Sequence, residues 1–249
     1  MTFTALVLAG SRPETDPVAA YVGVGHKALI ELGGDTLLAR VIGALEQAGA
    51  DRIGVSAAQL AVADAARALS DKVKVIPASA SPSQSVAEGA EAMGLPLLVT
   101  TVDHALLQPE WVTRFLADVP PEADIAALVA PESAVREAAP ETQRSYLSFR
   151  DGRYSGCNLF YLRNARALAM IALWRQVEAD RKRPWRIAAR LGIGILARYA
   201  LGRLTLDEMV DGLGRRVGVK AAAVRTPYGL AAVDVDKPAD LDLVRSLVA

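Results

Sequence analysis

Short apolar runs alternate along the first half of the chain with longer stretches in which apolar residues recur every three or four positions. The short runs predict strands at residues 4–8, 52–56, 74–76, 96–101 and 125–130. The longer stretches, rich in Ala and Leu, predict helices at residues 36–48, 59–69, 83–93 and 109–116. Nearly continuous apolar strands such as "LPLLVTT" are typical of a parallel sheet with helices on both faces. The pattern therefore predicts an α/β fold with a mostly parallel central sheet.

The alternation ends near residue 131. The stretch "RSYLSFRDGRYSGCNLFYL" predicts a hairpin around Asp151 and Gly152, followed by another strand. A helix-rich stretch follows at about 164–217, and the strand pattern then returns in "VKAAAV" and "GLAAVDV". A last helix is predicted to begin at Pro238, since proline is favoured in a first helical turn. We expect one Rossmann-like domain over residues 1–249 with a helical insertion.

The composition excludes several classes of protein and of metal site. The chain has 249 residues with 28 basic and 28 acidic side chains, so no overall charge favours binding to nucleic acid. One cysteine and two histidines exclude a disulfide framework, a cysteine-based zinc cluster and a histidine-rich metal site. The sequence contains no run of about 18 apolar residues, so it predicts no transmembrane helix. Its first residues also lack the pattern of a signal peptide. We expect a cytoplasmic protein.

The residues that follow each strand are the first candidates for a site, because ligands of open α/β sheets bind at the carboxyl ends of the strands. In "LAGSR", after the first strand, Gly10 would let backbone N–H groups approach a phosphate, and Arg12 would neutralise it. Small turns after strands are common, so this motif alone is weak. In "GHKALIELGG", Lys27 is either part of the site or a solvated surface lysine.

The other candidate site residues are serines and aspartates. In "SPSQSVAEG", Ser83 is predicted to cap a helix, while Ser85 is placed to touch a ligand. Asp103 in "LLVTTVDHALL" follows the most apolar strand, where a carboxylate is costly to bury unless it is paired or binds a cation such as Mg²⁺. A helix cap or a salt bridge explains Asp103 equally well. In "AVDVDKPADL", Asp234 and Asp236 are predicted to share one face of a strand end.

Taken in order, these motifs resemble the MobA-like nucleotidyltransferases of the GT-A-type α/β fold. The resemblance rests on "LVLAGSR", a lysine before L-x-x-x-G-G, a Ser-x-x-x-x-Gly helix start, "TVDH" and "VDVDKPADL", and it covers about residues 4–163 and 219–248. That group includes molybdenum-cofactor guanylyltransferases, cytidylyltransferases and sugar-1-phosphate pyrophosphorylases. The resemblance implies that four small residues line the nucleotide, the last of them near its base or ribose: Ala9, Gly10, Ser11 and Ser85.

The resemblance also implies roles for the charged positions. Arg12 and Lys27 would bind the β- and γ-phosphates of the nucleotide, and Asp103 would hold Mg²⁺. Asp234 occupies the place of the acid in the family's D-I-x-T-P stretch and would be a second metal ligand, while Asn158 in "SGCNLFYL" would lie near the acceptor. The chain differs from the family pattern in the irregular stretch before "GVGHK" and in a histidine at the place of the usual proline.

Nucleotidyl transfer can use groups of this kind. An acceptor phosphate is already anionic, so it can attack the α-phosphorus of an NTP without a general base while pyrophosphate leaves. We therefore expect a Mg²⁺-dependent enzyme that transfers an NMP to a sugar-, polyol- or head-group phosphate. Two alternatives remain. A GT-A glycosyltransferase would use an Asp-x-Asp where "TVDH" supplies one acid, and a degenerate protein would bind nucleotide without catalysis.

Residues 181–206, inside the predicted insertion, contain seven cationic side chains and no acidic one. On a single helix through this segment, Arg186, Arg190 and Arg198 would share one edge, opposite an apolar face that includes Trp185. Such a helix would suit peripheral contact with the anionic inner face of a membrane, where the acceptor would be a lipid precursor. The same apolar face would equally suit packing on the protein's own core or a homodimer interface.

Overall fold

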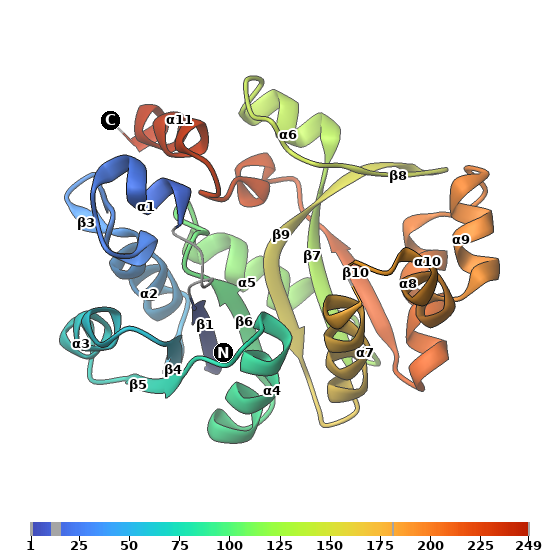
Figure 1. Cartoon of the computed structure of the whole chain (residues 1–249), viewed down its shortest axis with the longest axis horizontal. Coiled ribbons are helices and arrows are strands. Elements are labelled where there is room, and N and C mark those ends of the chain that lie inside the picture. The colour runs from blue at the N-terminus through green and yellow to red at the C-terminus, as the bar shows by residue number, and fades with distance from the viewer. Residues whose placement is uncertain (1, 11–15, 181, 249) are drawn as a thin grey trace.

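The computed structural model, which describes residues 2–10, 16–180 and 182–248, is built around an eight-stranded sheet (Figure 1). The main path of the sheet runs in the order β10, β7, β9, β6, β1, β4, β5, and β8 pairs with β9 outside this path. The strands are β1 Phe3–Ala9, β4 Ala50–Ala57, β5 Val73–Pro77, β6 Leu97–Thr101, β7 Ile125–Pro131, β8 Leu147–Phe149, β9 Gly152–Leu162 and β10 Ala221–Arg225.

The sheet is mostly parallel, as the sequence predicts. β1 pairs in parallel with β4 and β6, β4 with β5, and β10 with β7. Strand β9 runs antiparallel to β6 and β7, and it forms the expected hairpin with β8 at Gly152. The five strands predicted in the first half of the chain are all confirmed. A separate two-stranded hairpin joins β2 (Glu31–Leu32) to β3 (Asp35–Thr36).

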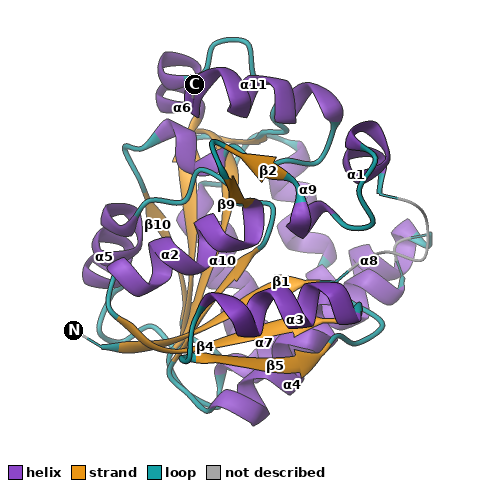
Figure 2. Cartoon of the chain, turned by 90° about the vertical axis from the view of Figure 1, so that its left-hand side faces the viewer, coloured by secondary structure: helices purple, strands orange, loops and turns teal. Residues whose placement is uncertain are grey.

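Helices cover both faces of the sheet (Figures 1 and 2). Side chains alternate along β1, so Ala5 and Val7 pack with α2, α3, α5 and α11, whereas Leu6 packs with α4 and α7. No helix in the described ranges is long and apolar enough to cross a bilayer. The helices outside the insertion are α1 Pro17–Val22, α2 Leu37–Gln47, α3 Leu60–Leu69, α4 Pro82–Met93, α5 Pro109–Asp118, α6 Glu132–Ala138 and α11 Pro238–Val248.

The described residues of the helix-rich stretch form four helices at the right of Figure 1: α7 Ala167–Ala179, α8 Pro184–Leu191, α9 Ile193–Ala200 and α10 Leu206–Val217. The prediction of a single helix across 184–199 is wrong. Gly192 adopts a φ of 99°, a left-handed backbone that favours glycine, and it separates α8 from α9. The expected arginine edge is therefore divided between two helices and partly neutralised: Arg190 pairs with Asp180 at 2.7 Å and Arg198 with Glu208 at 2.9 Å.

The strand expected in "GLAAVDV" is also wrong. Gly229–Ala232 forms a 3-10 helix, and the chain then continues as an extended segment outside the sheet. The backbone N–H of Val235 donates to the carbonyl of Asp103 at 3.0 Å, so this segment lies against the residues that follow β6. Asp234 and Asp236 consequently reach the carboxyl edge of the sheet from a connection between elements.

Candidate active site

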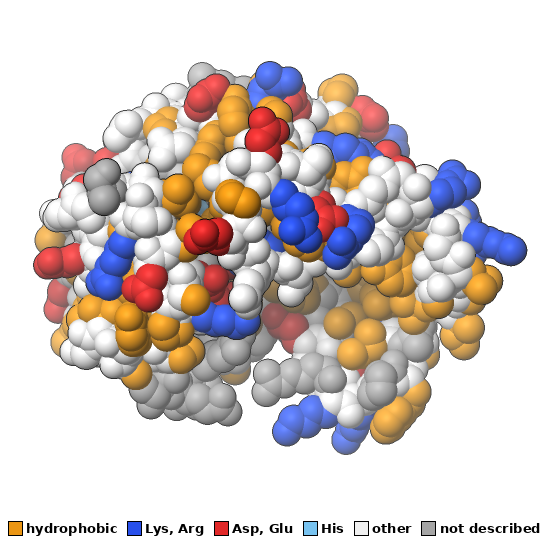
Figure 3. Space-filling model, turned by 90° about the horizontal axis from the view of Figure 1, so that it is seen from above, with side chains coloured by type: hydrophobic (Ala, Val, Ile, Leu, Met, Phe, Trp, Pro, Cys, Tyr) orange, Lys and Arg blue, Asp and Glu red, His pale blue; other side chains and the backbone are white. Residues whose placement is uncertain are grey.

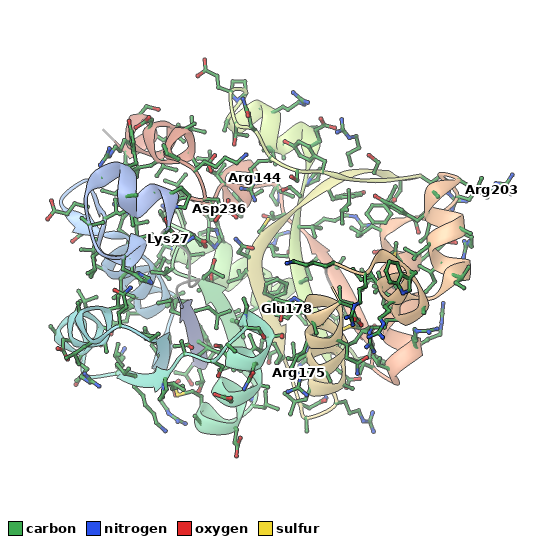
Figure 4. All side chains as sticks on the ribbon, viewed as in Figure 1. Lys27, Arg144, Arg175, Glu178, Arg203 and Asp236 are labelled. Carbon is green, nitrogen blue, oxygen red and sulfur yellow. The ribbon has the colours of Figure 1, made fainter. Side chains whose placement is uncertain are left out.

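The carboxyl ends of β1 and β6 open at the same edge, because the two strands are parallel neighbours. Ala9 ends β1, and Asp103 lies two residues beyond β6. Figure 4 shows Lys27, Asp236 and Arg144 converging at this edge from separate parts of the chain. Seen from above, the molecule is hollowed on this face, with charged side chains of both signs around the hollow (Figure 3). The edge therefore brings together residues that are far apart in sequence.

Lys27 joins two of the predicted acids. Its Nζ donates to Asp103 Oδ2 at 2.5 Å and to Asp236 Oδ1 at 3.3 Å. Burial alone would lower the pKa of Lys27 and raise that of Asp103, but their mutual attraction outweighs burial, so the pKa of Lys27 is raised and that of Asp103 lowered. Thr101 also donates its hydroxyl to Asp103. Both partners are thus held in their charged forms. Lys27 is not a solvated surface lysine.

The histidine that precedes Lys27 explains the difference from the family pattern. Lys27–Leu29 forms a short 3-10 helix, and the Nδ1 of His26 caps it by accepting from the N–H of Ala28 at 3.0 Å. His26 is buried, and burial lowers its pKa, which keeps Nδ1 available as an acceptor. The side chain of His26 therefore stabilises the turn that presents Lys27 to the site.

Asp234 has different partners from Asp103. Arg144, from the segment between α6 and β8, donates to both carboxylate oxygens of Asp234, with Nη2 at 3.1 Å from Oδ2. The Nδ2 of Asn158 donates to Oδ2 of the same carboxylate at 2.7 Å. Burial raises the pKa of Asp234 even though Arg144 opposes that shift. Arg144 was missed by the sequence analysis, because "AAPETQRSYL" carries no motif and its partner lies 90 residues away.

Asn158 is held in an unusual backbone conformation. Its φ is 47°, and among the described non-glycine residues it alone has a positive φ. It lies where the pairing of β7 with β9 shifts register between Ala127 and Val129. Asparagine tolerates this left-handed region better than most residues do, but the conformation still costs free energy. The irregularity aims the Asn158 amide at Asp234, on the side of the sheet edge where an acceptor was expected.

The first turn of α4 corrects one prediction. Ser81, and not Ser83, caps the helix, since its side chain accepts from the N–H of Gln84. The hydroxyl of Ser83 instead donates to Glu178 of α7. Ser85 is nearly buried and accepts from the N–H of Ser79 at 3.0 Å. Ser85 therefore shapes the loop after β5, at the end of the sheet where a base or ribose was expected.

The turn after β1 is described only in part. Ala9 is buried and Gly10 is exposed, whereas Ser11 and Arg12 lie outside the described residues. A Cβ added to Gly10 would meet only the Cβ of Ala78, at an ordinary contact distance of 3.7 Å. Neither the packing nor the backbone angle therefore requires glycine at this position. Close approach of a ligand to the backbone is a reason that remains.

The donor set fits a hard divalent cation that shares its coordination with a substrate. Asp103 and Asp234 supply carboxylate oxygens, which Mg²⁺ prefers, and Mg²⁺ is commonly held by one or two carboxylates plus substrate phosphates. In the described part of the chain, no group of three or more His, Cys, Asp or Glu side chains is arranged to hold a metal ion. Asp103 and Asp234 are thus candidate ligands that would need substrate oxygens to complete the coordination, and in the structure they are paired with Lys27 and Arg144.

His104, beside Asp103, belongs to the core. It is almost fully buried, stacks on Trp111 with ring centroids 6.2 Å apart, and its Nδ1 lies 3.3 Å from Thr100 Oγ1. Burial lowers its pKa from 6.5 to about 4, so the folded protein holds the imidazole neutral. Below about pH 6.5 the unfolded chain takes up a proton that the folded chain does not, and stability falls as the pH decreases toward 4.

We expect this linkage to appear in His104→Phe, which keeps an aromatic ring against Trp111 but cannot titrate. Between pH 7.5 and pH 5, the unfolding free energy of the wild type should fall by about 2 kcal/mol more than that of the variant. Urea unfolding of both proteins at the two pH values measures the difference. Equal pH dependence in the two proteins would contradict a neutral buried imidazole.

Comparison with known proteins gives one family and several similar structures. The model of the MobA-like NTP transferase domain matches residues 5–190. A hypothetical transferase from Thermus thermophilus is 32% identical, with 97% of this chain and 100% of that chain covered and a TM-score of 0.81. No curated protein sequence matches this chain.

Two more distant structures share the fold. A 4-diphosphocytidyl-2C-methyl-D-erythritol synthase from Anaerococcus prevotii is 10% identical, with 98% and 94% of the two chains covered and a TM-score of 0.60. A CMP:2-keto-3-deoxy-manno-octonic acid synthetase complexed with CTP is 16% identical, with 98% of each chain covered and a TM-score of 0.55. Both alignments span nearly the whole chain, including the helices of residues 167–217.

Proposed function

Because the chain belongs to the MobA-like NTP transferase domain family, we propose that it is a Mg²⁺-dependent nucleotidyltransferase that transfers an NMP from an NTP to a phosphorylated acceptor. The observation that carries this proposal is the position of Lys27, held between Asp103 and Asp236 at the carboxyl edge of the sheet. A cation and metal-binding carboxylates beside the turn after β1 suit the triphosphate of a nucleotide. Residues 1–249 would act as one domain, with 164–217 as a helical insertion.

In the proposed reaction, an oxygen of the acceptor phosphate attacks the α-phosphorus of the NTP. The bond from the α-phosphorus to the oxygen that bridges to the β-phosphorus breaks, and pyrophosphate leaves with the electron pair. Lys27 would leave Asp103 for the β- and γ-phosphates, together with Arg12, and would stabilise the charge on the leaving group. Mg²⁺ bound at Asp103 and Asp234 would supply further charge neutralisation. Ala9 and Gly10 would position the nucleotide, with Ser85 near its base or ribose.

Pyrophosphate release with each of the four common NTPs tests the proposal, with Mg²⁺ and a panel of sugar, polyol and head-group phosphates as acceptors. We expect release that needs Mg²⁺, one NTP and an acceptor together. Hydrolysis or transfer from a nucleotide sugar, with no pyrophosphate from any NTP, would indicate a glycosyltransferase instead. Binding of NTP without turnover with any acceptor of the panel would count against catalysis of this type.

We also propose that the enzyme works in the cytoplasm and contacts the anionic inner membrane face through α8 and α9. These helices expose large apolar side chains: Trp185 is 68% exposed and Ile193 is 74% exposed. Exposed cations accompany them, including Arg203, which Figure 4 places at the far edge of the molecule from Lys27. The whole of 181–206 carries no acidic side chain. Apolar side chains flanked by cations suit an anionic lipid surface.

Ile193→Ser tests the membrane contact, with Leu60→Ser on α3 as the matched control, since Leu60 is 72% exposed on another element. We expect the wild type and Leu60→Ser to sediment with phosphatidylglycerol vesicles at low salt, and Ile193→Ser to lose about tenfold in partitioning. Phosphatidylcholine vesicles and high salt are the controls for charge. Recovery in the supernatant throughout would contradict the proposal, and a dimer that Ile193→Ser dissociates would assign the face to a second copy.

A further inference from the structure

We infer that Arg144 binds the phosphate monoester of the acceptor. Before a divalent cation binds, Arg144 pairs with the carboxylate of Asp234, and the cation then displaces Arg144 from that carboxylate. The inference rests on the proposed function and names the group that receives the second substrate. Figure 4 shows Arg144 at the same edge as Lys27 and Asp236, although it comes from the segment before β8. No sequence motif marks this arginine.

The position of Arg144 along the sheet edge places it on the side of the second substrate. The order β5, β4, β1, β6, β9, β7 places the strands next to the nucleotide turn on one side of β6 and strand β9 on the other. Asp103 follows β6, between the two halves. Arg144 and Asn158 of β9 donate to the same carboxylate, that of Asp234. The guanidinium therefore lies on the acceptor side of the carboxylate that would hold the metal.

Arg144 and a divalent cation would compete for the same oxygen atoms of Asp234. Both oxygens of Asp234 accept from Arg144, and Oδ2 also accepts from Asn158. The side chains of Arg144 and Asp234 are 15% and 8% exposed, so water compensates little for any lost contact. A divalent cation on Asp234 needs oxygen lone pairs that Arg144 now occupies, and it repels the guanidinium. Binding of the cation would thus release Arg144 from Asp234, and the guanidinium would move only a short distance.

Asp234 leaves part of the Arg144 guanidinium without a hydrogen-bond partner. The carboxylate binds the two terminal nitrogens, Nη1 and Nη2. The Nε of Arg144 is buried and has no hydrogen-bond partner among the described residues. A buried N–H without an acceptor costs free energy, so this pose is not the best environment that the guanidinium can have. A phosphate can accept from Nε and a terminal nitrogen together, in the two-pronged geometry that arginine favours.

Binding measurements on the whole protein test the inference with Arg144→Gln, and Arg153→Gln serves as the matched control. Arg153 is an exposed arginine on β9 that pairs with Glu132. Mn²⁺ affinity is read from the electron paramagnetic resonance signal of the unbound ion. We expect Arg144→Gln to bind Mn²⁺ about tenfold more tightly than the wild type, because a competing cation has been removed. Arg153→Gln should be unchanged.

The affinity for inorganic phosphate should move in the opposite direction. In the Mn²⁺-loaded protein, measured by calorimetry, Arg144→Gln should bind phosphate at least about tenfold more weakly than the wild type. Arg144→Lys keeps the charge without the fork, so it should bind Mn²⁺ like the wild type and phosphate more weakly. If Arg144→Gln does not fold, Arg144→Lys carries the test through its phosphate affinity. Unchanged phosphate affinity in the folded variants, or weaker Mn²⁺ binding in Arg144→Gln, would overturn the inference.

These readouts also separate the inference from the proposed function. Pyrophosphate release with unaltered Mn²⁺ and phosphate affinities in the variants would leave the nucleotidyltransferase standing and remove the role of Arg144. Opposite shifts in the two affinities, without pyrophosphate release from any NTP, would establish the exchange of cations and reject the reaction.

Discussion

Asp103→Asn should lower Mg²⁺-dependent turnover by about 10²–10³-fold while the protein remains folded. Asparagine keeps the shape of the side chain: its amide oxygen can still accept from Lys27, and its NH2 group can donate to the hydroxyl of Thr101, which donates to the other oxygen of Asp103 in the structure. It cannot supply the negative charge that a metal ion needs. Steady-state pyrophosphate release measures the loss, and thermal unfolding measures the state of the fold. Near-normal turnover in the folded variant would exclude Asp103 as the metal ligand.

The two aspartates near residue 235 provide the matched comparison for this result. Asp234 is buried with Arg144 and Asn158, whereas the side chain of Asp236 is 60% exposed and pairs with Lys27 at 3.3 Å. We therefore expect Asp234→Asn to lower turnover far more than Asp236→Asn. The opposite order would show that the exposed acid of the pair holds the metal.

Lys27→Ala should lower kcat/KM for the NTP by about 10²–10³-fold, because it removes the cation assigned to the leaving pyrophosphate. The affinity for the corresponding NMP, which has no β- or γ-phosphate, should change little. Arg12→Ala should behave in the same way, and calorimetric titration with NMP and NTP measures both variants. Since Lys27 neutralises a largely buried carboxylate, its removal also costs stability, which unfolding experiments report separately.

Lys220→Ala is the control for this experiment, because Lys220 is exposed at the opposite end of the sheet, before β10. It should leave both affinities unchanged. Equal losses of NMP and NTP affinity in Lys27→Ala would place this lysine away from the terminal phosphates. Similar losses in the control would point to a general effect of surface charge.

Periodicity predicted the regular elements well, because long strands and amphipathic helices follow local rules. The short helix α1 was not predicted, since six residues are too few to show a period. Its signals are terminal: Asp16 accepts from two backbone N–H groups, and Gly23 ends the helix in a left-handed conformation. The segment "GLAAVDV" has the apolar character of a strand but leaves the sheet, because its backbone hydrogen bonds go to a 3-10 helix and to Asp103.

Some residues of the candidate site could be predicted from sequence motifs, and others could be found only from the structure. The motifs "GHKALIELGG" and "LLVTTVDHALL" identified Lys27 and Asp103 as candidates, and the structure brings these two residues into contact. Which aspartate is buried depends on tertiary contacts, since Asp234 and Asp236 look alike in sequence. Arg144 could not be found from its neighbours, because its environment is created by Asp234 and Asn158. Sequence motifs therefore predict where the site forms, but which side chains pair within it depends on how the chain packs.

The sheet order has a consequence for synthesis on the ribosome. Strand β7 pairs with β10, and Ile125 meets Ala221 only after about a hundred further residues have been made. At ordinary elongation rates this interval lasts about 5 to 20 s. During that time β7 is an open strand edge, and Asp103 lacks its contact with the segment at 234–236. The nascent chain thus has an unpaired apolar edge and an incomplete site at the same time, and a chaperone that shields β7 would protect that edge until β10 has been made.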